Sequence, residues 1–354
     1  MRHLRTNAAF VAVSIASILL SGGVLFGYLS TAPSAPAMRL GFFPNIIHSQ
    51  ALYGIATGEY EKALQRVSYA MQPQVFNAGP AAIQALLSNH VDVVFVGPSP
   101  TLSGLAAAPN DLRVIAGASS GGAMFVAQPD IRLVNNSDFG GRKFATPQWG
   151  NTQDIALKYY LWNKTGHRTL DEGGDVDVIN AANPEILTLF KLRHIDGAWV
   201  PEPWATRLIQ EANAKVILDE RDLWPRGQFV STQILTTRRY LEDAAHQAVL
   251  TAFLRAYVNV TLHLQKAKPA DLQVIGDEIY NLTATRLDRT TILAPAFRNF
   301  DVTYDPIAPS LATYLSWAQA LDFLAQTLHP DTLYDLTLLN QVLNEMGLPP
   351  VKGL

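Results

Sequence analysis

Residues 143–166, which read KFATPQWGNTQDIALKYYLWNKTG, contain the pattern of a strand, a loop and a helix. An apolar strand is predicted at residues 144–146, and a helix is predicted to begin at Asn151 or Thr152. Asn151 is a favourable N-cap, and Asp154 carries the negative charge that a helix N-terminus prefers. The pattern leaves free backbone N–H groups directly beyond a strand, where open α/β sheets bind anionic or polar ligands.

Two further residues of this stretch, Gly166 and Trp149, bear on its structure. Gly166 is expected to end the helix, since glycine is the common residue just past a helix C-terminus. Trp149 in the loop has two interpretations that the stretch alone leaves open. It can offer a flat apolar wall beside the free N–H groups, or it can be buried in an ordinary strand-to-helix turn.

The same order of motifs occurs twice, at offsets of 103 and 104 residues. FNAG at residues 76–79 begins a predicted helix, as INAA does at residues 179–182. The strand that opens with HVD ends in PSP at residues 90–100, and the one that opens with HID ends in PEP at residues 194–203. The shared order indicates an internal duplication, and the alternation of strands and helices indicates mostly parallel sheets.

We therefore predict a two-lobed α/β fold in which each lobe is a mostly parallel sheet flanked by helices. Lobe 1 is predicted to comprise residues 38–122 and 233–354, and lobe 2 residues 123–232. Two linkers, near residues 121–126 and 229–233, would form a two-stranded hinge. Late helices are predicted at residues 244–266, 270–280, 309–328 and 333–346, with a loop at residues 301–306.

Residues 1–37 have the pattern of an export signal or a membrane anchor. Arg2 and Arg5 precede a nearly uncharged apolar run at residues 8–29, and Ala35-Pro36-Ala37 fits a cleavage site. The run is long enough to span a bilayer, which takes about 20 residues, if it is not removed. Either outcome places the remaining chain outside the cytoplasm.

The composition excludes several classes of protein. The formal net charge is only −3, so nothing suggests binding to nucleic acid. The sequence has no cysteine, which excludes disulfides, thiol catalysis and cysteine-ligated zinc. The 8 histidines show no tight metal-ligand spacing. We expect neither a metal nor a cofactor.

Six motifs together resemble one family. They are GFFPN at residues 41–45, FNAGP at 76–80, VGPSP at 96–100, AGASSGG at 116–122, TPQWGNTQD at 146–154 and WVPEPW at 199–204. Over residues 39–350 the chain resembles periplasmic substrate-binding proteins of ABC importers, in the group for aliphatic sulfonates, taurine, nitrate and thiamine precursors. The aliphatic-sulfonate branch is nearest.

The resemblance implies a type II-like, Venus-flytrap binding protein without enzymatic activity. It implies a monomer outside the cytoplasm that captures a small sulfonate-like ligand and delivers it to an ABC permease with its ATPase. If residues 1–37 are not removed, they would also contact the membrane. The alternative ligands are a thiamine or pyrimidine precursor, nitrate and bicarbonate.

The ligand is expected between the lobes, against the loops of these motifs. No Arg or Lys occurs in these loops, so helix N-termini and backbone N–H groups would hold an anion. Aromatic side chains would lie beside its tail. The candidate substrate-binding residues are Phe43, Pro44, Asn45, His48, Asn77, Ala78, Gly79, Gly97, Pro98, Ser99, Ser119, Ser120, Gln148, Trp149, Gly150, Asn151, Thr152, Trp199 and Glu202.

Besides Trp149, four of these residues have competing interpretations. Trp199 can form part of the apolar wall or of the core. His48 can hydrogen-bond a ligand, or it can cap or pack the helix that follows. Glu202 can line the cleft, although holding its own loop is favoured because a carboxylate repels an anion. Ser119 lies in GASSG at residues 117–121, which matches the G-x-S-x-G motif of serine hydrolases. That motif needs a helix immediately afterwards, whereas a strand is predicted at residues 123–127, so a turn facing the cleft is favoured.

Overall fold

The computed structural model describes residues 36–324 and 328–354. The chain divides into two units, Met1–Pro36 and Ala37–Leu354, and the fold below is that of the second unit. The predicted signal or anchor at residues 1–37 lies outside the described residues, apart from its last two. Within the described part, no helix is both long and apolar enough to cross a membrane.

The first sheet has six strands in the order β11-β4-β10-β3-β1-β2. Four strands, β1 to β4, run in one direction, while β10 and β11 run in the other. The sheet consists of β1 Ala37–Phe42, β2 Ala70–Val75, β3 Val93–Val96, β4 Leu112–Gly121, β10 Val230–Thr237 and β11 Phe300–Val302.

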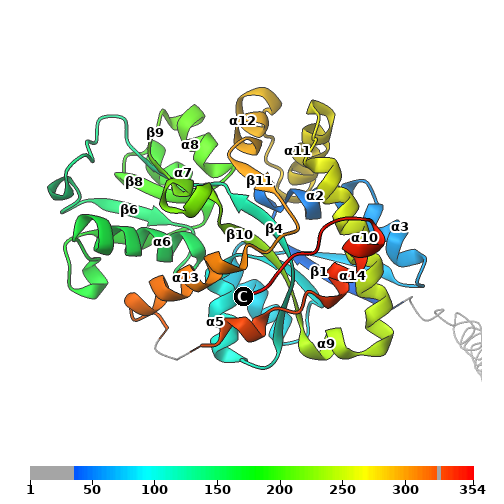
Figure 1. Ribbon diagram of the computed structural model, residues 1–354. Helices are drawn as coiled ribbons and strands as arrows, with labels where there is room; N and C mark the ends of the chain where they lie inside the picture. Colours follow the sequence, from blue (N-terminus) through cyan, green and yellow to red (C-terminus); the bar gives the residue numbers. More distant parts are fainter. Residues whose placement is uncertain (1–35, 325–327) are drawn as a thin grey trace, which may run out of the picture. The chain divides into compact units, whose positions relative to one another are not determined.

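The second sheet has five strands in the order β7-β6-β8-β5-β9, and only β5 runs against the others. It consists of β5 Ala123–Ala127, β6 Lys143–Thr146, β7 Asp177–Asn180, β8 Gly197–Pro201 and β9 Lys215–Asp219. Figure 1 shows the two sheets side by side, each with helices around it. The predicted fold class, two lobes with mostly parallel sheets, is confirmed.

Helices cover both sheets (Figure 1). Those around the first sheet are α2 Ser49–Ala56, α3 Glu59–Gln65, α4 Gly79–Leu87, α5 Pro98–Ala107, α9 Arg238–Glu242, α10 Ala244–Leu264, α11 Pro269–Thr283 and α14 Thr337–Glu345. Those of the second lobe are α6 Thr152–Tyr160, α7 Asn183–Lys191 and α8 Trp204–Ala212. Two later helices also lie between the lobes: α12 Ala294–Phe297 contacts α8 and β11, and α13 Ala308–Ala320 contacts α6 and α5.

The internal duplication is visible in matching hydrogen bonds. In the first lobe the Arg39 N–H donates to Asp92 Oδ2 at 2.8 Å. In the second lobe the Lys143 N–H donates to Asp196 Oδ2, also at 2.8 Å. Asp92 and Asp196 are the aspartates of the two repeated HVD and HID motifs, so the repeat read from the sequence corresponds to one structural unit used twice.

The chain crosses between the sheets twice. The first crossing is the direct passage from β4 into β5 at Gly121 and Gly122, whose φ angles of 84° and 77° favour glycine. The return runs through two short 3-10 helices, η5 Glu220–Leu223 and η6 Pro225–Gly227. The predicted second linker at residues 229–233 was therefore placed too late, because most of it belongs to β10. The lobe ranges 38–122, 123–232 and 233–354 stay a prediction.

Three predicted secondary structures were wrong. The expected turn at residues 117–121 is strand, because β4 continues to Gly121 beside β10. The expected loop at residues 301–306 begins inside β11, which pairs with that extension of β4. The helix predicted at residues 309–328 ends at Ala320, and Asp322 then adopts a left-handed φ of 54°.

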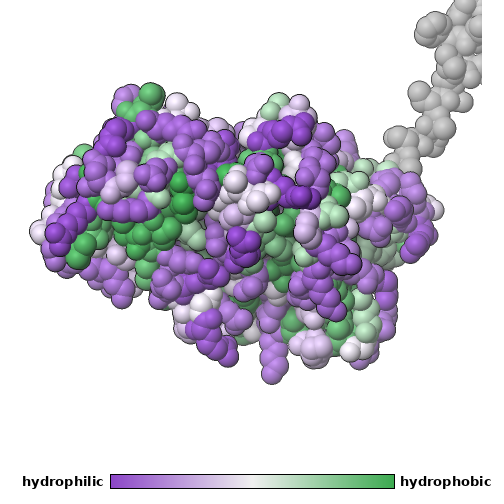
Figure 2. All heavy atoms as spheres, turned by 90° about the horizontal axis from the view of Figure 1, so that it is seen from above, coloured by the Kyte–Doolittle hydropathy of each residue, from purple (hydrophilic) through white to green (hydrophobic). Residues whose placement is uncertain are grey.

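One apolar core joins the two lobes on the side of α13. Its buried residues come from both sheets, and Tyr159 of α6 stacks on Trp317 of α13 with ring centroids 4.8 Å apart. Figure 1 shows α13 beside α6. The surface seen from above is mostly hydrophilic, interrupted by apolar patches (Figure 2). The α6–α13 packing holds the second lobe against the first.

Candidate ligand-binding site

A small cavity of about 40 Å³ lies between the lobes. Its lining comes mainly from segments at the carboxyl ends of β1, β2 and β3 in one sheet and of β6, β7 and β8 in the other. Open α/β sheets bind ligands at this edge. The lining residues are Phe43, Asn45, Ile47, His48, Asn77, Ala78, Gly79, Gly97, Pro100, Pro147, Asn151, Thr152, Gln153, Asn183, Pro201 and Ser231.

Three helices, α4, α5 and α6, begin at this cavity. The N-cap residues Ala78 and Gly97 make no side-chain capping bond to α4 or α5. The first N–H groups of a helix have no acceptor within it, and each N-terminus carries about half a positive charge. The cavity therefore faces several positive helix ends without a cationic side chain.

The N-terminus of α6 is held by Asp154, which is completely buried. The Asp154 N–H donates to the side chain of its own N-cap, Asn151, at 2.9 Å. The Asp154 carboxylate accepts hydrogen bonds from Thr146 Oγ1 at 2.7 Å, the Gly150 N–H at 2.9 Å and Asn180 Nδ2 at 3.0 Å, and pairs with Lys158 Nζ at 3.2 Å.

This network determines which donors remain for a ligand. Gly150 was predicted to contact the ligand; it does not line the cavity, and its N–H donates to Asp154, so this N–H is not free for a ligand. The N–H groups of Thr152 and Gln153, the first two residues of α6, have no acceptor within the helix and lie at the cavity. The Asp154 carboxylate thus fixes a loop that presents two backbone donors.

The two lobes approach each other closely between Gly97 and Thr152. A Cβ atom on Gly97 would lie 2.5 Å from Thr152 Oγ1 and 3.4 Å from the Ser231 carbonyl oxygen. Gly97 follows a strand of the first sheet, and Thr152 begins a helix of the second lobe. The absence of a side chain at Gly97 is therefore what allows the cleft to close to its observed width.

The cavity contains no formal charge on its lining. Among the lining residues that the structure describes, none is Lys, Arg, Asp or Glu. Burial lowers the pKa of His48 to about 3, so its ring is neutral near pH 7. Its Nδ1 accepts the Phe43 N–H at 3.4 Å, which leaves the ring proton on Nε2. His48 can therefore donate a hydrogen bond without contributing a charge.

The structure brings nine of the predicted site residues together around this cavity, and their contact with a ligand stays a proposal. They are Phe43, Asn45, His48, Asn77, Ala78, Gly79, Gly97, Asn151 and Thr152. Pro98 and Ser99 directly follow Gly97, and Pro44 lines an adjacent cavity. Reasoning from the sequence missed Ile47, Pro100, Pro147, Gln153, Asn183, Pro201 and Ser231. Most of these lie beside a predicted motif residue, so a wider window around each motif would have found them.

Two candidate tryptophans lie away from this cavity. Trp199 is completely buried, stacks on Phe125 and donates its Nε1–H to Glu220 at 2.8 Å, so it belongs to the core. Trp149 is 58% exposed and packs on Phe323 rather than lining the cavity. Of the two interpretations left open for each, an apolar wall was one, but neither side chain forms part of this cavity.

The polar candidates Ser119, Ser120, Gln148 and Glu202 do not line this cavity either. Ser119 lies within β4 and shares a hydrogen bond with Ser231 at 3.1 Å, and Ser120 accepts the Phe229 N–H. Gln148 lies in the loop before α6, away from the lining. Glu202 is buried and accepts from Thr206 and from Asn299 Nδ2 at 2.6 Å, so it holds its loop. Because β4 continues past Ser119, the chain does not form the strand-to-helix elbow of a hydrolase.

Glu220 is a buried carboxyl at the return crossing between the lobes. Its oxygens accept from Trp199 Nε1 of the second lobe and, at 2.6 Å, from the hydroxyl of Tyr314 in α13. Burial raises the pKa of Glu220 from 4.5 to about 7. The folded state therefore favours the protonated form, and folding loses stability as the pH rises from about 4.5 to 7.

We expect Glu220→Gln to remove this part of the pH dependence. The wild type should lose up to about 3 kcal/mol of unfolding free energy from this group between pH 4.5 and 7. Urea unfolding of both proteins at pH 5 and pH 8 measures the difference. Glu242→Gln, a change at a side chain that is 62% exposed, should keep the wild-type dependence. Equal dependence in all three proteins would contradict the assignment.

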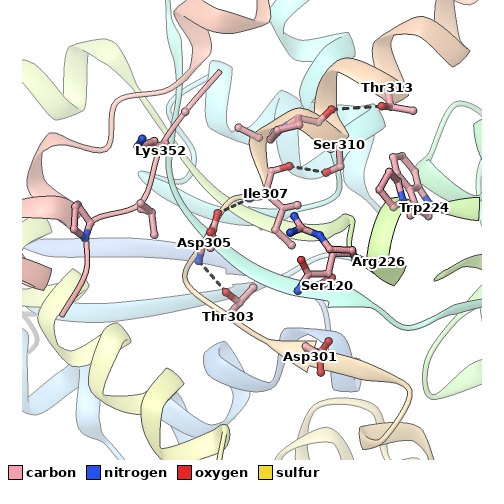
Figure 3. A pocket seen from close by; sticks show the side chains of 17 residues that line it. Ser120, Trp224, Arg226, Asp301, Thr303, Asp305, Ile307, Ser310, Thr313 and Lys352 are labelled. Carbon is pink, nitrogen blue, oxygen red and sulfur yellow. Dashed lines mark hydrogen bonds between the residues drawn. The ribbon is translucent and has the colours of Figure 1, made fainter.

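A second cavity, of about 660 Å³, lies beside the hinge and includes Ser120 in its lining (Figure 3). Its polar groups are largely used to shape the chain. Ser310 donates to the Ile307 carbonyl, Asp305 accepts the Ile307 N–H, and Thr303 accepts the Asp305 N–H. The smaller cavity remains the better candidate, because strand ends and helix N-termini from both lobes meet there.

Comparison with known proteins gives one family and a set of shared folds. A model of the NMT1-like family matches residues 31–274. No curated protein matches the sequence. The alkanesulfonate-binding protein SsuA from Xanthomonas axonopodis pv. citri bound to MOPS has a TM-score of 0.67 at 15% identity, covering 83% of this chain and 96% of that chain.

Two further solved structures share the fold. The periplasmic nitrate-binding protein NrtA from Synechocystis PCC 6803 has a TM-score of 0.72 at 13% identity, covering 90% of this chain and 91% of that one. A cysteine-to-serine mutant of DszB in complex with biphenyl-2-sulfinic acid has a TM-score of 0.62 at 13% identity, covering 88% and 99%. These identities show a common fold alone.

The resemblance predicted from the motifs is confirmed by these matches, which include sulfonate-binding and nitrate-binding proteins. The family model spans more than half of the sequence, including both predicted copies of the repeat. The chain belongs to the NMT1-like family.

Proposed function

We propose that this protein is the solute-binding component of an ABC importer. It captures a small sulfonate-like ligand between its two lobes outside the cytoplasm and delivers the ligand to a permease. The observation that carries this proposal is the meeting of the N-termini of α4, α5 and α6 at a cavity without charged side chains. Such helix ends hold anions through backbone N–H groups.

The donors around the cavity suit the head group of a sulfonate. In this proposal the N–H groups of Gly79, Thr152 and Gln153 point to its oxygens, while Thr152 Oγ1 and His48 Nε2 add side-chain donors. Thr152 approaches from one lobe, and Gly79 and His48 approach from the other. A bound head group would therefore bridge the lobes and stabilise the closed cleft, which is the form that a permease would recognise.

We infer that the protein has no catalytic activity. Ser119 is completely buried within β4 and bonded to Ser231, so it is not placed as an accessible nucleophile. The DszB structure carries a mutated cysteine, whereas this sequence contains none. The cavity lining contains no carboxylate, and the lowered pKa of His48, about 3, makes its neutral ring a weak base.

A neutral ligand that carries N–H groups, such as a pyrimidine precursor, is the second candidate. Asn45 Oδ1 and Asn183 Oδ1 are buried acceptors without a hydrogen-bond partner, and both residues line the cavity. A sulfonate offers these oxygens no donor, whereas a ring N–H or an amino group would satisfy them. Nitrate and bicarbonate are small enough for a cavity of this size. Nitrate, however, offers these two oxygens no hydrogen-bond donor, and bicarbonate offers only one.

Thr152→Ala is expected to weaken sulfonate binding by about 1.5–3 kcal/mol, the scale of a hydrogen bond to a charged group. Isothermal titration with ethanesulfonate, nitrate, bicarbonate and an aminopyrimidine measures the effect. Thr188→Ala is the matched control, because Thr188 is an exposed threonine on α7 of the same lobe. Normal sulfonate affinity in Thr152→Ala would contradict the proposed hydrogen bond from Thr152 Oγ1 to the sulfonate. Binding of the aminopyrimidine alone would favour the second candidate.

A further inference from the structure

Helix α13 is anchored in the first lobe. The chain that leads to it runs beside β4, where the Gly117 N–H donates to the Tyr304 carbonyl at 2.8 Å. Within the helix, Ser310 Oγ accepts the Val230 N–H of β10 at 2.9 Å. The helix also contacts α5, and further along the chain the 3-10 helix η8 Pro330–Leu333 contacts β4 and α5 again. The segments on both sides of α13 therefore pack on the first lobe.

The carboxyl end of α13 reaches the second lobe instead. Trp317 stacks on Tyr159 of α6, with ring centroids 4.8 Å apart and ring planes inclined by 13°. Phe323, just beyond the helix, packs on Trp149 with ring centroids 4.7 Å apart. A side chain at Gly150 would clash with the Phe323 ring, so this ring covers the loop before α6. The loop and α6 both belong to the second lobe.

The same helix packs on the return crossing between the lobes. The Tyr314 hydroxyl donates to Glu220 Oε1 at 2.6 Å. Trp224, at the end of η5, has its ring centroid 4.9 Å from that of Tyr314 and 4.7 Å from that of Trp317. All four side chains are buried. Helix α13 is therefore joined by buried contacts to the first lobe, to the second lobe and to the crossing about which the lobes would move.

Helix α6 is in contact near both of its ends. Thr152 at its start lies against Gly97 of the first lobe, and Tyr159 in its last turn lies against Trp317. The two positions are seven residues apart, which is close to two helical turns, so they lie on one side of the helix. A second lobe that rotates away from Gly97 takes α6 with it and must separate the stacked rings at its other end. Loss of these aromatic contacts opposes opening of the cleft.

We propose that α13 and Phe323 form a latch that stabilises the closed arrangement of the two lobes, whether or not a ligand is bound. Neither Tyr159, Trp317 nor Phe323 lines the cavity between the lobes, so the latch is separate from the candidate binding site. The latch sets the ratio of open to closed molecules. A site that is complete only in the closed form gains apparent affinity in proportion to the closed fraction. The latch does not depend on the identity of the ligand.

A distance measurement between the lobes tests the latch. The sequence has no cysteine, so Gln84→Cys on α4 and Leu192→Cys just after α7 place one spin label on each lobe. Both positions are exposed. Double electron–electron resonance of this labelled protein without added ligand should give one dominant distance. Adding Tyr159→Ala and Phe323→Ala should produce a second, longer distance and raise the ratio of open to closed molecules by about tenfold or more.

Two further variants of the labelled protein serve as controls. Tyr159→Phe keeps the stacked ring and should keep the distances of the parent. Tyr280→Ala removes a tyrosine ring that is 40% exposed on α11 of the first lobe, and it should also leave the distances unchanged. Circular dichroism and thermal unfolding show that the variants remain folded.

The latch would be overturned if the distances stay the same in the variant that lacks Tyr159 and Phe323. An equal shift in Tyr280→Ala would overturn it as well, because the effect would then not come from the contacts of α13. Failure of sulfonates to bind would contradict the proposed function but would leave these ligand-free distances unchanged, so the two failures are distinguishable.

Discussion

Gly97→Val is expected to abolish ligand binding while the protein remains folded. The backbone of Gly97 has φ −77° and ψ 167°, a conformation open to any residue, so valine causes no backbone strain. Its side chain would enter the cavity of about 40 Å³, where even a Cβ lies 2.5 Å from Thr152 Oγ1. The variant both fills the proposed head-group site and keeps Thr152 away from it.

We expect the affinity of Gly97→Val for a sulfonate to fall by at least about a thousandfold, which corresponds to about 4 kcal/mol. Isothermal titration measures the affinity, and thermal unfolding shows that the fold is kept. A ligand that binds Gly97→Val as it binds the wild type does not occupy this cavity, and the proposed site would then be wrong.

A smaller change at the same position separates steric contact from loss of a donor. Gly97→Ala places its methyl group against Thr152 Oγ1, whereas Thr152→Ala removes that oxygen. If contact between the lobes limits closure, the double variant should bind about as well as Thr152→Ala alone, because the methyl group then has space. If the losses of binding free energy in the two single variants simply add up in the double variant, this would argue against contact between these two residues.

Asp154→Ala is expected to lower the unfolding free energy by about 3–5 kcal/mol, the scale for breaking a buried ion pair. The carboxylate is completely buried and satisfies Thr146, the Gly150 N–H, Asn180 and Lys158. Its removal leaves the Lys158 ammonium, which is only 9% exposed, without its nearest partner. The loop before α6 should also lose its fixed shape, so ligand binding should weaken too.

Urea unfolding of the ligand-free protein measures this effect. Asp171→Ala is the matched control, because Asp171 also lies near Lys158, at 3.8 Å, but is 62% exposed. An exposed pair contributes about 0–1 kcal/mol, so the control should change little. Equal losses in the two variants would mean that burial of Asp154 is not the cause.

Much of the secondary structure around β6 and α6 was predicted from local sequence patterns. Asn151 caps α6 as expected, and Gly166 ends the helical segment in a left-handed conformation with φ 77°. Capping and helix termination depend on side-chain chemistry within a few residues, so the sequence contains that information directly. The repeated aspartates Asp92 and Asp196 were recognisable because their motifs recur in the sequence, although each accepts from a backbone N–H that lies 53 residues away.

The same kind of reasoning failed where a side chain had two possible surroundings. Trp199 and Trp149 both lie near strand ends in conspicuous motifs, yet one is completely buried and the other is 58% exposed. Burial of Trp199 depends on Glu220 and Phe125, which are distant in sequence. A local sequence pattern does not determine which distant residues a large aromatic side chain will contact.

The sequence by itself determined the two-lobed fold class, the duplication and most of the loops that meet at the candidate site. These follow from periodicity, capping and the rule that parallel strands bring their carboxyl ends to one edge. Only the tertiary structure decided that Asp154 binds Asn180 as well as the Gly150 N–H, and that Gly97 lies against Thr152 across the cleft. The physical reason is that these contacts join lobes or loops, and competition among distant partners for each donor is settled only when the chain is packed.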